Sequence, residues 1–137
     1  MNEGRLKYNL ILIGSLISIL LSRLYVYEGG PLGVYIYGTE LHHIYYGIMI
    51  LWVSWLVLII TDGLGWDILD HLISLSVGIG LGFISDEINF IFYWRHYTLS
   101  DYHSVVNIGA DIVLILFLII LYLSPRLSTD SREEDIS

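Results

Sequence analysis

Nine polar residues of this 137-residue chain lie in or beside long apolar runs, and their side chains could do chemistry there. They comprise carboxylates, imidazoles, amides and one guanidinium: Arg23, Glu40, His43, Asp86, Glu87, Asn89, His103, Asn107 and Asp111. Carboxylates and imidazoles together suit Zn, Fe or Mn. The same groups can relay protons, since histidine titrates near neutrality, or can form an ion-pair network that joins helices. The residue types are therefore compatible with three alternatives: a metal site, a proton or ion path, or a structural ion-pair network that locks the helices together.

The spacing of these residues predicts that they share one depth in a helix bundle. Residues 41–60 and 68–95 are both apolar, and a short polar turn separates them. Two helices joined by a tight turn rise equally from it, at ~1.5 Å per residue. His43 and Asp86 are equally far from that turn, at roughly 28 Å, so we expect them to lie level with each other.

Two further helices bring polar groups to the same layer. The next turn is centred near Leu99, and counting from it places Asp111 level with Asp86 or Glu87. These two acids are adjacent, so they cannot both face one point. Arg23, on the first helix, falls near the same depth. A second layer, further from the membrane centre, consists of Glu40, Asn89, His103 and Asn107.

Two spacings favour shared helix faces within these layers. Glu40 and His43 form a Glu-x-x-His pair, which directs a carboxylate and an imidazole to one helix face, as in di-metal carboxylate bundles. His42 lies about 100° around that helix from His43. His103, Asn107 and Asp111 follow i, i+4, i+8 spacing. The predicted ligands of a divalent transition metal are Glu40, His43, Asp86, Glu87, His103 and Asp111. The predicted ion-pair or proton-relay residues are Arg23, Asn89 and Asn107.

The composition excludes several other classes of function. Six Lys and Arg stand against fourteen Asp and Glu, so no basic patch exists for nucleic acid. The absence of Cys excludes disulfides and thiolate metal sites. Gly78-x-Gly80-x-Gly82 follows no strand, so it indicates close helix packing rather than nucleotide binding. Haem is not expected, because His71 has no histidine facing it. No catalytic residue is assigned, and whether the protein is an enzyme stays open.

The hydrophobic pattern predicts an all-α, four-span antiparallel up-down transmembrane helix bundle. The chain is 55% hydrophobic, with a mean hydropathy of +0.70. Runs of about 20 apolar residues are long enough to cross a ~30 Å hydrocarbon core. The expected spans are residues 8–27, 41–60, 68–95 and 105–123, within a transmembrane domain of residues 1–124. Residues 125–137 are charged and are expected to be a disordered tail.

The distribution of basic residues predicts the orientation in the membrane. Arg5, Lys7, Arg126 and Arg132 flank the outer ends of the first and last spans, against Arg23 and Arg95 at the opposite side. The positive-inside rule then favours a multi-pass protein of the cell membrane with cytoplasmic termini. The lipid bilayer is the expected partner, and a homo-oligomer or a larger membrane complex stays open.

Two motifs resemble functionally uncharacterised small four-helix integral membrane proteins of archaea and bacteria. The first is His42-His43 followed by Gly47, and the second is the Gly-x-Gly-x-Gly-x-x-x-Asp-Glu run of residues 78–87. The resemblance covers residues 40–111. It implies the four-span topology and singles out His43 and the two acids as site residues, but it implies no activity.

Overall fold

Four long helices dominate the structure. The computed structural model describes residues 3–31, 33–36, 39–61, 65–93 and 98–124, with the backbone alone for residues 33–36, 39–40 and 93. The elements are α1 (Glu3–Tyr27), β1 (Gly33–Ile36), β2 (Thr39–His42), α2 (His43–Thr61), α3 (Asp67–Asp86), α4 (Phe90–Tyr93), α5 (Leu99–Tyr102) and α6 (Val105–Leu123). The segments long and apolar enough to cross a membrane are α1, α2, α3 and Leu99–Leu123, which joins α5 to α6. The predicted tail, residues 125–137, lies outside the described residues.

The third helix is shorter than the predicted range of residues 68–95. It ends at Asp86, and the backbone turns over residues 87–89 before α4 begins. Hydrogen bonds of the turn run from the Phe90 amide to the Glu87 carbonyl at 2.9 Å and from the Ile88 amide to the Ser85 carbonyl at 3.3 Å. The turn ends α3 at the polar residues, so residues 87–89 do not continue along the helix axis.

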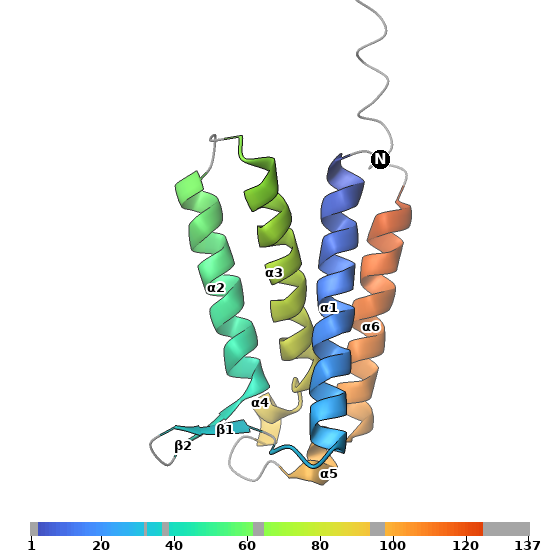
Figure 1. The fold of residues 1–137 in the computed structure, drawn as a ribbon. Helices are drawn as coiled ribbons and strands as arrows, with labels where there is room; N and C mark the ends of the chain where they lie inside the picture. The colour runs from blue at the N-terminus through green and yellow to red at the C-terminus, as the bar shows by residue number, and fades with distance from the viewer. Residues whose placement is uncertain (1–2, 32, 37–38, 62–64, 94–97, 125–137) are drawn as a thin grey trace, which may run out of the picture.

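The long helices lie side by side in the order α2, α3, α1, α6 (Figure 1). The most extensive contact is between α1 and α3, followed by α2 with α3; α6 contacts both α1 and α3. The hairpin, α4 and α5 gather at one end of the bundle, which we call the hairpin end. Helix α2 therefore stands at one edge of the row and packs mainly against α3.

A seam of small residues brings α1 and α3 close together. Ser15 Oγ donates a hydrogen bond to the Gly78 carbonyl at 3.0 Å, across the two helices. A Cβ placed on Gly78 would collide with the Ile11 backbone, and one on Gly82 would collide with Ser18. Gly80 instead faces α2, where its Cβ would lie 3.0 Å from the Gly47 carbonyl oxygen. The predicted packing role of the three glycines is confirmed, and it serves two interfaces.

A short hairpin, which the sequence analysis did not predict, connects α1 to α2. Strands β1 and β2 pair antiparallel, from Gly33 opposite His42 to Ile36 opposite Thr39. The strand residues Val34, Tyr35 and Ile36 are β-branched or aromatic, and such residues favour strands. The preceding Gly and Pro residues indicated only a connection.

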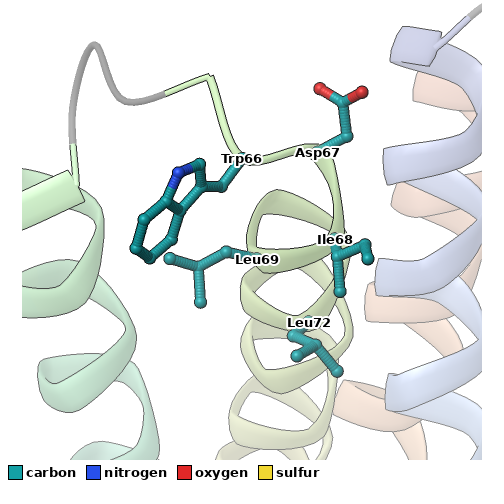
Figure 2. Close-up of a pocket in the computed structure, with 5 residues that line it drawn as sticks. All are labelled: Trp66, Asp67, Ile68, Leu69 and Leu72. Carbon is teal, nitrogen blue, oxygen red and sulfur yellow. The ribbon is translucent and has the colours of Figure 1, made fainter.

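The opposite end of the bundle is held by surface charges and carries an apolar groove. Lys7 Nζ lies 2.7 Å from Asp70 Oδ2, across α1 and α3. A groove of about 480 Å³ lies at the start of α3. Figure 2 shows the residues that line it: Trp66, Asp67, Ile68, Leu69 and Leu72. The Asp67 carboxylate points away from the apolar side chains. The groove therefore offers an apolar surface, whereas the buried Asp86 lies at the hairpin end.

Candidate functional site

The end of α3 places Asp86 against α1 and α5. Asp86 is fully buried, and its Oδ1 lies 2.6 Å from Arg23 Nε, on the last turns of α1. The hydroxyl of Tyr102, in α5, donates a hydrogen bond of 2.6 Å to Asp86 Oδ2. The Arg23 guanidinium also lies over the Tyr102 ring, 4.8 Å from its centroid. One carboxylate thus joins three helices.

Arg23 bridges Asp86 to a second acid on α6. Its Nη2 donates a hydrogen bond to Asp111 Oδ2 at 2.9 Å. The other oxygen of Asp111 accepts a hydrogen bond from Ser85 Oγ, also at 2.9 Å. A guanidinium with parallel N–H groups suits this bridging of two carboxylates. The arrangement ties α1, α3 and α6 together at one depth.

Glu87 turns toward the hairpin and the start of α2. Its Oε1 lies 3.2 Å from Nδ1 of His42, the last residue of β2. Its Oε2 accepts a hydrogen bond from the Ile44 amide at 3.1 Å. This amide belongs to the first turn of α2, where N–H groups lack intrahelical partners and the helix dipole favours a negative charge. Glu87 therefore caps α2 from another part of the chain.

Two asparagines complete the connection to α6. The Asn89 amide donates to Asn107 Oδ1 at 2.8 Å, and Asn107 Nδ2 donates to the Tyr102 carbonyl at 3.1 Å. The side-chain amide of Asn89 donates to Ser104 Oγ at 3.0 Å. Both asparagines are buried. Together they satisfy backbone groups around the turn between α5 and α6, which would otherwise be costly to bury.

One five-residue segment, Ser85–Asn89, thus contacts each of the three long helices besides α3. We call it the hub. Its residues reach α1 and α5 through the Asp86 side chain, β2 and α2 through the Glu87 side chain, and α6 through the Ser85 side chain and the Asn89 backbone amide. The hub lies at the end of α3, near one surface of the predicted membrane. Its geometry can hold helices in register, and it uses most of the predicted site residues to do so.

The structure brings together Arg23, Asp86 and Asp111, as the depth count predicted. It also separates Asp86 from Glu87, which have different partners. Sequence reasoning assigned no role to Tyr102, Ser85 or His42. Tyr102 lies in a separate short helix, so no periodicity connects it to Asp86.

His43 is buried, but the contacts that the structure shows for its ring are aromatic. Its centroid lies 5.9 Å from that of Phe83 and 6.3 Å from that of Tyr25. Its Nδ1 has no hydrogen-bond partner within the described part of the chain. The depth prediction for His43 placed it near the hub, yet its ring lies among aromatic side chains.

Two predictions that polar residues share a helix face are wrong. Glu40 pairs with Tyr35 in the hairpin, and α2 begins only at His43, so the Glu-x-x-His spacing does not act on a helix. The side chain of Glu40 lies outside the described residues. His103 precedes α6 and is exposed, with its ring against that of Tyr102 at 5.3 Å. It does not share a helix face with Asn107 and Asp111, because α6 starts at Val105.

Within the described ranges, no group of three or more His, Asp or Glu side chains is placed to hold a metal ion. The physical reason lies in the partners of the acids. Asp86 and Asp111 face Arg23 and hydroxyl donors, and Glu87 faces His42 and a backbone amide.

Comparison with known proteins adds no name to this site, since no family model, curated protein or solved structure matches the chain.

Proposed function

We propose that the chain is a multi-pass protein of the cell membrane, whose four spans cross the bilayer in antiparallel up-down order. The four apolar helices support insertion. Figure 1 supports the order, because α2 starts beside the hairpin and α3 starts at the opposite end. Helices of 19 to 25 residues match a ~30 Å hydrocarbon core at ~1.5 Å per residue.

Within this fold, the hub acts as a structural lock, and the protein serves as a structural or accessory membrane subunit. The observation that carries this proposal is that each of the three buried acids is held by partners from other elements. Ionisable groups inside a membrane protein are costly, so they face the bundle and pair with one another. Such pairing fixes which helices meet and at what height.

Proton or ion conduction receives less support from the same helices. Residues 8–22 of α1 and 72–85 of α3 contain no Asp, Glu, His, Lys or Arg. They form the tight seam described above, in which even an added Cβ would collide with backbone. A relay of titratable side chains would need such groups through this depth, whereas the charged pairs lie at the two ends of the seam.

One observation favours metal binding as a second candidate function. The buried Nδ1 of His43 has no partner in the described part of the chain, and a neutral imidazole nitrogen is a common metal ligand. The metal would be a divalent transition ion such as Zn, Fe or Mn, with ligands drawn from the predicted set. Asp86, Glu87 and Asp111 would have to turn from their present partners toward it, beside His43.

Elemental analysis, combined with measurements of the free energy of unfolding, distinguishes the two proposed functions. The lock predicts no stoichiometric metal in the purified protein, and a loss of about 3–5 kcal/mol in the free energy of unfolding for Asp86→Asn. The matched control is Asp67→Asn, at the exposed start of α3. Stoichiometric metal that disappears in His43→Ala, with little stability loss in Asp86→Asn, would favour the metal function instead.

A further inference from the structure

A groove of about 370 Å³ lies between α2 and α3, and we call it the α2–α3 groove. Its lining combines apolar side chains with three hydroxyls: Tyr46, Met49, Ile50, Val53 and Ser54 of α2, and Ser76 of α3. Ligand pockets of ~300–1,000 Å³ are typically apolar, with a few polar groups that fix the orientation of the ligand. The α2–α3 groove has this composition and this size.

The two serines of the groove have hydroxyls that are available to a ligand. Ser54 is 5% exposed, and within the described part of the chain the hydroxyls of Ser54 and Ser76 have no hydrogen-bond partner. Other hydroxyls of these two helices are bonded internally. Ser74 Oγ donates to the Asp70 carbonyl at 2.8 Å, and Thr61 Oγ1 donates to the Val57 carbonyl at 2.8 Å. A hydroxyl that is buried without a hydrogen bond is costly, so an acceptor in the groove would stabilise the site.

The depth of the serines restricts which molecules can supply that acceptor. Ser54 lies roughly 16 Å from the first residue of α2, and Ser76 lies roughly 14 Å from the first residue of α3. Both are therefore near the middle of a ~30 Å hydrocarbon core. Phospholipid ester groups stay at the surfaces of that core, and lipid tails carry no acceptor. The ligand must bring an uncharged polar head that itself dissolves in hydrocarbon.

We propose that the α2–α3 groove binds a lipid-soluble quinone, whose ring carbonyl accepts hydrogen bonds from Ser54 and Ser76. A quinone head is flat and uncharged, and its carbonyl oxygens act only as acceptors, so it suits hydroxyl donors in the hydrocarbon core. Met49 and Val53, which line the groove and are exposed, would cover the ring. Tyr46 lies roughly 12 Å nearer the hairpin end than Ser54, too far to share that carbonyl. The site is separate from the hub.

Quinone binding is measured in lipid nanodiscs by saturable quenching of tryptophan fluorescence, with a decyl-tailed benzoquinone as the probe. Decylbenzene, which has no carbonyl, should compete poorly for the site. Ser54→Ala and Ser76→Ala should each weaken quinone binding roughly two- to tenfold, the effect of one hydrogen bond. The matched control is Ser74→Ala, because the Ser74 hydroxyl is already bonded within α3. This variant should bind as the parent protein does.

A second variant tests the position of the site without removing a hydroxyl. Val53 is 57% exposed at the groove, and Val113 is 66% exposed on α6. Val53→Phe should weaken quinone binding several-fold by filling the groove, whereas Val113→Phe should leave it unchanged. Equal affinities for these two variants would place the site elsewhere and overturn the proposal.

Three further outcomes would also overturn the proposal. Quenching that does not saturate in the parent protein would show that the quinone only dissolves in the lipid. Equal effects of Ser54→Ala and Ser74→Ala would exclude the hydrogen bond. Competition by decylbenzene as strong as that of the quinone would leave the groove to ordinary acyl chains. The proposal rests on membrane insertion, which alkaline carbonate extraction of each variant tests separately, so the two failures are distinguishable.

Discussion

Arg23 lies between two buried acids at the hairpin end. It lies 2.6 Å from Asp86 Oδ1 and 2.9 Å from Asp111 Oδ2, whereas at the other end of the seam Lys7 meets Asp70, whose side chain is 39% exposed. The two cations lie on the same helix and both reach α3, so they form a matched pair. Their surroundings predict unequal contributions to stability.

Arg23→Met should cost about 3–5 kcal/mol in the free energy of unfolding, because it leaves buried carboxylates without a countercharge. Lys7→Met should cost at most about 1 kcal/mol, since water screens the partly exposed pair. Denaturation in detergent, followed by far-ultraviolet circular dichroism, measures both. Similar losses for the two variants would contradict a special role for the hub.

At the scale of elements, the α1–α3 seam depends on the absence of side-chain atoms at specific positions. A Cβ on Gly78 would meet the Ile11 backbone, whereas a Cβ on Gly109 of α6 would meet nothing within 4 Å. Overpacking typically costs 1–3 kcal/mol, but an unobstructed Gly→Ala change in a helix gains roughly 0.5–1 kcal/mol. The same substitution should therefore have opposite signs in the two helices.

We expect Gly78→Ala to lower the unfolding midpoint in denaturant and Gly109→Ala to leave it unchanged or raise it. Parallel denaturant titrations of the two variants and the parent protein provide the measurement. If Gly78→Ala is as well tolerated as Gly109→Ala, the helices do not approach as closely as the structure shows.

The start of α2 depends on a carboxylate that lies far away in the sequence. Glu87→Ala removes the acceptor of the Ile44 amide, and losing a helix cap typically costs about 0.5–2 kcal/mol. Amide exchange should accelerate at residues 43–45 and stay unchanged in the middle of α3. Glu28→Ala, at an exposed position, is the control. Uniform acceleration along the chain would show that Glu87 contributes only to global stability.

Depth could be predicted from the sequence because helices rise at a constant rate. The count placed Arg23, Asp86 and Asp111 together, and the structure pairs them. It failed for Glu40, since the hairpin delays the start of α2 to His43. The partners of the acids were not predictable either. Tyr102 reaches Asp86 only because α5 folds back at the end of the bundle, and no local pattern indicates such a return.

At the scale of the whole molecule, the hub lies near one membrane surface, so its position can be related to orientation. Under the proposed topology, α5 faces outward and the start of α3 faces the cytoplasm. Ser100 and Asp67 are exposed, and the chain has no native cysteine. Cysteines at these two positions therefore report on opposite sides of the bilayer.

In intact cells, Ser100→Cys should react with a membrane-impermeant maleimide, and Asp67→Cys should react only after permeabilisation. The reason is the excess of basic residues at the ends of the chain, which favours cytoplasmic termini. A gel shift after labelling gives the result. The reverse pattern would show that the protein has the opposite orientation in the membrane. Labelling of both positions from outside would contradict a membrane span between them.

The placement of α3 between α1 and α2 has a consequence for biosynthesis. The principal neighbour of α1 is α3, which follows it only after the hairpin and α2 have been made. During insertion, Ser15 must wait in or near lipid for the Gly78 carbonyl, and Arg23 for the Asp86 and Asp111 carboxylates. A nascent chain truncated before α3 should therefore remain bound to the insertion machinery through α1. Release should come when residues 78–86 enter the membrane.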